Sequence, residues 1–211
     1  GAGLVGIHTV SAHPLVAPFG GTTRVLGTNP IAFGFPCEGD PLVIDMGTSA
    51  FMGTDLQFRE RMGTPIPEGV ALDQKGQPTT NAGEGQRGAL LPFGGSNGGY
   101  KGFGLALAME ALGVLCASAR PSEDIRGYMI IAFKPDLFIP LEDYRQDLAD
   151  RIAAIKSSPR QDGVDEIRIP GERSYRSREK LRREGIEIDY KIYDGLSRLA
   201  QGLHNHGANP D

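Results

Sequence analysis

The sequence has no tryptophan, two cysteines, no excess of positive charge and no long uninterrupted apolar run. Cys37 and Cys116 are too few for a disulfide framework and lack metal-site spacing, so we expect no bound metal. The net charge of −4 argues against the basic surface that nucleic-acid binding requires. The longest apolar stretch, 105–116, is interrupted by Glu110 and Gly113, and no secretory signal is visible. These features predict a cytoplasmic protein with no nucleic-acid or membrane partner.

Glycine is the abundant residue, with 30 copies concentrated in the first half of the 211-residue chain. Glycine is favoured where the backbone needs a positive φ or a close approach, which is typical of shaped binding loops. The length and the 39% of hydrophobic residues suit one medium domain with a real core.

The first half of the chain alternates short apolar stretches with glycine and proline loops. Three of these stretches predict strands, at 3–10, 30–35 and 42–46. Residues 55–62 predict a short helix capped by Thr54. The polar, turn-rich segment 63–86 is interpreted as a surface excursion.

The second half is dominated by helical patterns. The segment 100–117 is apolar nearly all round, which predicts a buried helix. The remaining segments predict strands at 127–133 and 166–169, and helices at 141–156, 172–184 (ending at Gly185) and 190–203. These elements do not form regular βαβ units, so a doubly wound parallel sheet is not favoured.

The glycine-rich loop 92–104 carries the strongest chemical signal. A helix beginning at Lys101 would offer free N–H groups, a positive dipole end and an ammonium group to a pyrophosphate or carboxylate. No hydroxyl residue follows Lys101, which argues against a nucleotide hydrolase, and the loop is not G-x-G-x-x-G. A flexible connection with a solvated lysine remains the alternative.

Two further turns carry polar side chains. Thr28 and Asn29 lie in a turn between glycine and proline, which forms either a binding site or an ordinary turn. Asp45 ends an apolar strand and is followed by small hydroxyl residues, so its carboxylate could hold ribose hydroxyls or cap the next element.

The histidines give no catalytic assignment. His8 and His13 lie near the start, and His204 and His206 lie in a polar tail. Neither pair has a carboxylate or cysteine at ligand spacing. The catalytic residues are therefore unknown from the sequence, and we expect His8 to be a packed strand residue.

Seven motifs in a fixed order carry a family resemblance. They are APFGG (17–21), LGTNPIAF (26–33), VIDMGTS (43–49), PEGVALDQKGQPTT (67–80), GALLPFGG (88–95), YKGFGLAL (100–107) and RIPGE (168–172). This series resembles the malate/L-lactate dehydrogenase-like family of oxidoreductases over essentially the whole chain.

The resemblance implies an α/β fold of the α+β type, with a non-Rossmann, mixed, largely antiparallel sheet flanked by helices. It implies hydride transfer between NAD or NADP and a small 2-oxoacid, such as those related to malate or lactate, or a cyclic imino acid. It also implies a homodimer. We expect residues 1–211 to form a single cofactor-binding, C-terminal domain, with a helical part at 141–203.

The resemblance also assigns cofactor-binding residues. They are Val43, Ile44, Asp45, Met46, Gly47, Thr48 and Ser49 at the strand end, Tyr100 and Lys101 before the long helix, Gly171, Glu172 and Arg173 in a third segment, and Thr28 and Asn29 in the turn.

Two departures from the family pattern affect the expected activity. The loop 94–99 is longer than usual. The family's N-terminal part, which carries a proton-donor histidine in S-H-G, an arginine and a second histidine in N-x-N-H, has no counterpart in these 211 residues. We therefore expect weak or no catalysis by this chain alone, with a separate N-terminal segment as a partner. The alternative is a non-catalytic cofactor-binding or dimerisation module.

Overall fold

The computed structural model describes residues 2–116 and 127–202, so His204 and His206 lie outside the described residues. The chain divides into two compact units, Gly1–Pro170 and Gly171–Asp211. Each unit is described by itself below, and the single-domain organisation stays a prediction.

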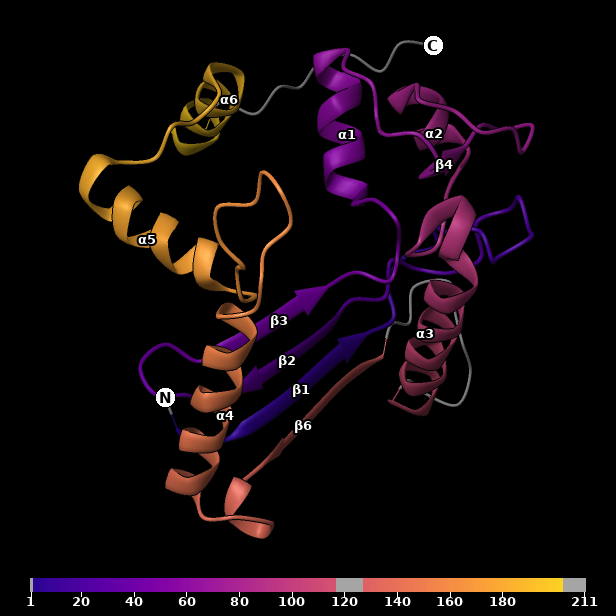
Figure 1. The fold of residues 1–211 in the computed structure, drawn as a ribbon. Coiled ribbons are helices and arrows are strands. Elements are labelled where there is room, and N and C mark those ends of the chain that lie inside the picture. Colours follow the sequence, from indigo (N-terminus) through magenta and orange to yellow (C-terminus); the bar gives the residue numbers. More distant parts are fainter. Residues whose placement is uncertain (1, 117–126, 203–211) are drawn as a thin grey trace. The chain divides into compact units, whose positions relative to one another are not determined.

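The first unit is built on a four-stranded sheet in the order β3-β2-β1-β6 (Figure 1). Every neighbouring pair is antiparallel, which confirms the non-Rossmann, largely antiparallel fold. The strands are β1 (Val5–Val10), β2 (Ile31–Phe35), β3 (Leu42–Met46) and β6 (Tyr128–Phe133), close to their predicted positions. A second antiparallel pair joins β4 (Ala71–Leu72) to β5 (Ala89–Leu90).

The two faces of the large sheet have different environments. Thr9 points toward α3 (Gly95–Cys116), where its hydroxyl lies 3.0 Å from the sulfur of Met109. The opposite face, here called the open face, is only partly covered: no described atom lies within 4 Å of a Cβ built at Gly6 or Gly34, and both glycines line a cavity that α4 (Leu141–Lys156) borders. Paired residues on neighbouring strands share a face, so this open face carries Asp45, Ala32, His8 and Ile130 in one row.

The main hydrophobic core lies in the part of the unit formed by α1 (Gly53–Met62), α2 (Ala82–Arg87), the small sheet and α3. It contains Val16, Leu26, Leu56, Ile66, Ala71, Ala82, Leu90 and Ala106. Three of these come from segment 63–86, which the sequence indicates as a surface excursion. That interpretation is wrong for its apolar residues: the turns are at the surface, but Ile66 and Ala71 are buried.

Helix α3 differs from its prediction in two ways. It begins at Gly95, so the glycine-rich segment is already helical and Lys101 lies in the second turn. It is also buried along one side only, because Leu107 and Val114 remain more than half exposed. By length and composition α3 could cross a membrane, a property that it shares with core helices of globular proteins.

Three smaller elements complete the first unit. Helix α1 begins one residue before Thr54, and its capping position, Met52, makes no side-chain hydrogen bond, so the predicted Thr54 cap is wrong. The short helix η1 (Pro135–Leu137) precedes α4 (Leu141–Lys156), which has the predicted bounds. The predicted strand at 166–169 is instead irregular, because none of its backbone pairs with a neighbouring strand.

The second unit contains α5 (Glu172–Glu184) and α6 (Tyr190–Ala200). Gly185 ends α5 with φ = 87°, which confirms its predicted role as a helix stop. No described residue of 171–202 is buried, and α6 exposes apolar side chains along one side.

Candidate functional site

Thr48 connects two of the predicted cofactor segments to the loop before α3. Its backbone N–H and its hydroxyl both donate to the carbonyl of Thr28, at 2.8 and 3.0 Å. Its own carbonyl accepts from the backbone N–H of Phe93 at 2.8 Å. The side chain is fully buried. The turn at 28–29, the end of β3 and the loop leading into α3 therefore lie side by side.

Gly102 brings the second turn of α3 against the same loop. A Cβ built at Gly102 would lie 2.0 Å from the carbonyl oxygen of Phe93, so only glycine allows this approach. Tyr100 and Lys101 precede this contact directly and remain exposed. The ring of Tyr100 packs edge-on to Phe19 at 6.1 Å. The structure thus brings together all the predicted segments of the first unit.

Asn29 lies inside this arrangement and not at its surface. Its side chain is fully buried, with Oδ1 accepting from the Ala12 N–H at 2.9 Å. Its Nδ2 donates to a Glu110 carboxylate oxygen at 2.9 Å and to the Ala106 carbonyl at 3.3 Å. The polar atoms of Asn29 are thus bonded to protein groups. Among the predicted residues, the exposed polar groups of this unit are Asp45, Tyr100 and Lys101.

Asp45 lies on the open face of the sheet together with His8. Ala32 separates them, so two strand spacings, about 10 Å, divide the two positions. The imidazole ring of His8 stacks on Tyr128 with 5.6 Å between centroids. Sequence reasoning did not connect His8 with Asp45, because strand order decides which residues share a row and no local pattern encodes it.

The first turn of α3 borders a cavity of about 880 Å³. Its lining includes Gly20, Thr22, Gly69, Thr79, Ser96 and Asn97. The helix starts at Gly95, six residues before Lys101, and the Gly95 N–H already donates to the Pro92 carbonyl at 2.8 Å. At 1.5 Å per residue the helix start and Lys101 are about 9 Å apart along the axis. The sequence predicts that the helix start and Lys101 lie together at one anion site, but the structure separates them along the helix.

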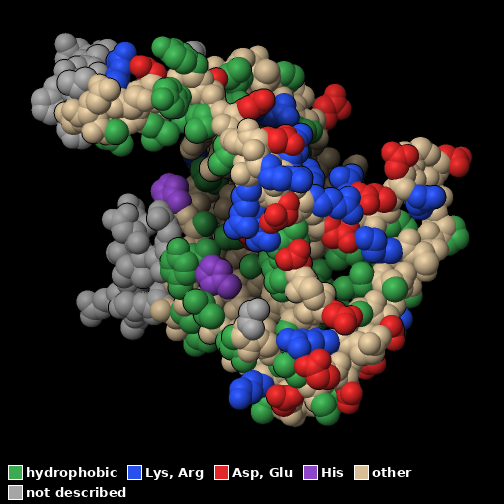
Figure 2. Space-filling model, turned by 90° about the vertical axis from the view of Figure 1, so that its left-hand side faces the viewer, with side chains coloured by type: hydrophobic (Ala, Val, Ile, Leu, Met, Phe, Trp, Pro, Cys, Tyr) green, Lys and Arg blue, Asp and Glu red, His purple; other side chains and the backbone are tan. Residues whose placement is uncertain are grey.

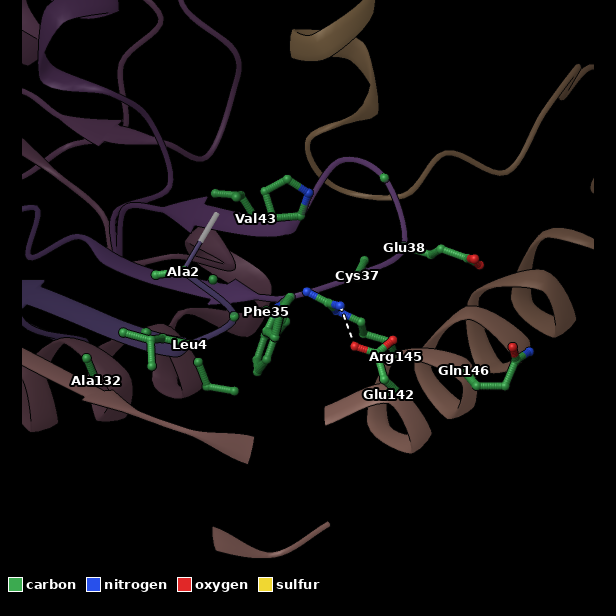
Figure 3. Close-up of a pocket in the computed structure, with 17 residues that line it drawn as sticks. Ala2, Leu4, Phe35, Cys37, Glu38, Val43, Ala132, Glu142, Arg145 and Gln146 are labelled. Carbon is green, nitrogen blue, oxygen red and sulfur yellow. Dashed lines mark hydrogen bonds and ion pairs between the residues drawn. The ribbon is translucent and has the colours of Figure 1, made fainter. Parts of the chain in front are cut away.

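A second cavity, of about 550 Å³, lies where β2 ends and β3 begins (Figure 3). Helix α4 forms one wall, where Arg145 pairs with Glu142 at 2.7 Å. Burial first, and then electrostatic repulsion by Cys37, raises the pKa of the neighbouring Tyr144 above its ordinary value. Of the predicted cofactor residues only Val43 lines this cavity.

The remaining predicted segment lies in the second unit. Gly171 has φ = 93° and immediately precedes α5, which places Glu172 and Arg173 in its first turn. Glu172 also pairs with Arg176 at 3.7 Å. The structure describes this segment only within its own unit.

The surface chemistry is mixed. On the face drawn in Figure 2, Lys and Arg side chains are interspersed with Asp and Glu, and hydrophobic side chains lie between them. Across residues 2–116 and 127–202, no three His, Cys, Asp or Glu side chains cluster as a metal site would require.

Comparisons with known proteins agree on one family. The family described as malate/L-lactate dehydrogenase matches residues 1–197. The malate dehydrogenase of Pyrococcus abyssi is 34% identical over 94% of this chain and 59% of its own length. A delta(1)-pyrroline-2-carboxylate/delta(1)-piperideine-2-carboxylate reductase of Pseudomonas aeruginosa is 35% identical over 95% of this chain and 61% of its own length.

Solved structures give the same picture. The sulfolactate dehydrogenase of Methanocaldococcus jannaschii superposes with a TM-score of 0.79 at 34% identity, over 95% of this chain and 59% of that one. The malate dehydrogenase of Pyrococcus horikoshii OT3 gives 0.81 at 32% identity, over 98% of this chain and 60% of that one. The chain thus spans about 60% of the length of these relatives.

Proposed function

The chain belongs to the malate/L-lactate dehydrogenase family, and on this premise we propose that it supplies the cofactor site of a nicotinamide-dependent oxidoreductase. Its substrate class is a small 2-oxoacid or 2-hydroxyacid, or a cyclic imino acid. Relatives named for malate, sulfolactate and pyrroline-2-carboxylate support this class. The whole enzyme acts in the cytoplasm as a homodimer, with a further N-terminal segment completing the site.

One observation carries the proposal: Thr48 links the turn at 28–29, the end of β3 and the loop before α3 through three hydrogen bonds. These segments are far apart in the sequence, and the turn and the end of β3 each match a cofactor segment that the family resemblance assigns. Tyr100 and Lys101 on α3 and Asp45 on the opposite face of the sheet are exposed, so their polar groups are available to a ligand that reaches around the end of β3.

The exposed groups have the chemistry that NAD or NADP requires. The Asp45 carboxylate can accept hydrogen bonds from ribose hydroxyls, and the Lys101 ammonium can neutralise a phosphate. The family resemblance adds Gly171, Glu172 and Arg173 as a third segment. When bound, the nicotinamide ring supplies or accepts the hydride. The residues of this chain bind and orient, which accounts for a large part of catalysis between two reactants.

The proton for the developing alkoxide or amine must come from a positioned acid. The family resemblance assigns that acid to the S-H-G histidine, a motif that these 211 residues do not contain. Within this chain the proposed role is therefore cofactor binding. A non-catalytic cofactor-binding or dimerisation module is the second candidate, favoured by the same absence.

Titration of the purified chain with NADH and with NADPH, followed by fluorescence or calorimetry, tests the proposal. We expect saturable binding of at least one of them, and comparison of the two gives the cofactor preference. Absence of binding to both would reject a cofactor site within this chain.

Lys101 gives a sharper test of the same site. Lys101→Ala is expected to weaken cofactor binding by about tenfold, because a hydrogen bond to a charged phosphate is lost. Lys75→Ala is the matched control, since Lys75 is also an exposed lysine but lies in the turn that follows β4. Equal affinities of the two variants for NADH and NADPH would remove Lys101 from the site.

A further inference from the structure

A polar pair, the buried Asn29 and the half-buried Glu110, joins three parts of the first unit. Glu110 lies on α3 and accepts hydrogen bonds from the Gly27 N–H at 3.2 Å and from Asn29 Nδ2 at 2.9 Å. Asn29 in turn accepts from the Ala12 N–H and donates to the Ala106 carbonyl. The segment after β1, the turn at 27–30 and the middle of α3 are thus held by one network.

The backbone around the pair is shaped to make this network. Asn29 has φ = 33°, the one positive value recorded for a non-glycine residue in the described chain. A Cβ at Gly27 would lie 2.3 Å from Asn29 Oδ1 and 2.4 Å from the Ala12 carbonyl. Glycine would adopt this positive φ with less strain than asparagine. The hydrogen bonds of the Asn29 side chain therefore offset the backbone strain at position 29.

The network bonds to α3 within three turns of Lys101. Ala106 lies five residues after Lys101, about 7.5 Å along the helix, and Glu110 about 13.5 Å. Bonds at these two positions set the rotation and the height of α3 against the turn. The same turn bonds to Thr48 through the carbonyl of Thr28. The position of Lys101 relative to the end of β3 therefore depends on this network.

We propose that Asn29 and Glu110 are positioning residues, which orient α3 so that Tyr100 and Lys101 meet the cofactor beside the end of β3. Asn29 then acts through α3 and not by touching the cofactor itself. This inference rests on the proposed function.

The test compares three variants of the chain by hydrogen exchange without cofactor and by NADH or NADPH titration. Glu110→Leu leaves the Gly27 N–H without its acceptor, and it leaves Asn29 Nδ2 with only the longer bond to the Ala106 carbonyl. We expect about tenfold faster exchange in 100–107 and about tenfold weaker binding. Glu110→Gln keeps an acceptor oxygen and is expected to restore both values to within about threefold. Met109→Ala, the control, opens a cavity in the adjacent helix position and is expected to lower the melting temperature while leaving both values near wild type.

The readouts separate the two proposals. Failure of the wild-type chain to bind either cofactor, with the exchange pattern as expected, would reject the proposed function and keep the control of α3 by the pair. Equal exchange in Glu110→Leu and Met109→Ala would overturn the positioning role, whatever the affinity. If Glu110→Leu does not fold, Asn29→Asp replaces it, because a carboxylate there faces the Glu110 carboxylate and the Ala106 carbonyl and should give the same changes.

Discussion

Gly102→Ala is expected to abolish measurable cofactor binding and to lower the free energy of unfolding by about 3 kcal/mol. The added methyl group would lie 2.0 Å from the carbonyl oxygen of Phe93 and 2.6 Å from its nitrogen. These are backbone atoms, and Phe93 N–H is bonded to Thr48, so they cannot move without disturbing the end of β3. The helix must shift away, and Tyr100 and Lys101 shift with it. Denaturant unfolding and cofactor titration measure the two effects.

Gly104→Ala is the matched control in the same helix. No described atom lies within 4 Å of a Cβ built there. Alanine should therefore stabilise the helix by about 0.5–1 kcal/mol, because glycine is a poor helix former. A Gly102→Ala variant as stable as Gly104→Ala would contradict the close contact between α3 and the Phe93 loop.

The second large expected effect is on turnover. We expect the 211-residue chain to oxidise NADH or NADPH on the order of 10²–10⁴ times more slowly than a full-length relative, because a positioned general acid contributes about that factor. The measurement follows loss of reduced-nicotinamide absorbance with the 2-oxoacid of malate and with piperideine-2-carboxylate. The malate dehydrogenase of Pyrococcus abyssi, assayed in parallel, provides the reference rate.

Turnover close to that of the reference would overturn this expectation and require a proton donor within these residues. His8 would then be the first candidate, because its imidazole lies on the same open sheet face as Asp45. His8→Gln should remove such activity, and Lys75→Ala should not.

The strands and the amphipathic helix α4 could be predicted because their signals are local. Leu42–Met46 is a short, mostly apolar stretch between turn residues, and Leu141–Lys156 repeats apolar residues at helical spacing. The start of α3 could not be predicted in this way. Glycine disfavours helix by propensity, but at Gly102 its absent side chain allows contact with the Phe93 loop, and tertiary packing outweighs propensity.

Segment 63–86 illustrates a different limit. Its turns are stabilised locally, as where the Asp73 carboxylate accepts from the backbone N–H groups of Lys75 and Gln77. Such chemistry is visible in the sequence and indicates a loop. The burial of Ile66 and Ala71 depends on α1, α2 and α3 closing over them, which no pattern inside the segment encodes.

The candidate site, too, could be predicted only in part. Motif order identified the segments around Asp45 and Lys101, and the structure brings them together through Thr48. Which of their side chains face outward could not be predicted. Thr28 and Asn29 look like surface turn residues, but Asn29 is fully buried, because its partners come from parts of the chain far away in sequence.

Strand β3 forms one edge of the large sheet, and this has a consequence for solubility. An edge strand exposes unpaired backbone groups that can recruit a strand from another molecule, and a charged side chain discourages such pairing. Asp45 is the charged residue of β3, so we expect it to disfavour strand pairing at this edge whether or not a nucleotide is bound. Either sign of charge at position 45 would protect the edge, whereas only a carboxylate could accept hydrogen bonds from ribose hydroxyls. The charge at position 45 therefore bears on solubility as well as on the proposed binding of ribose.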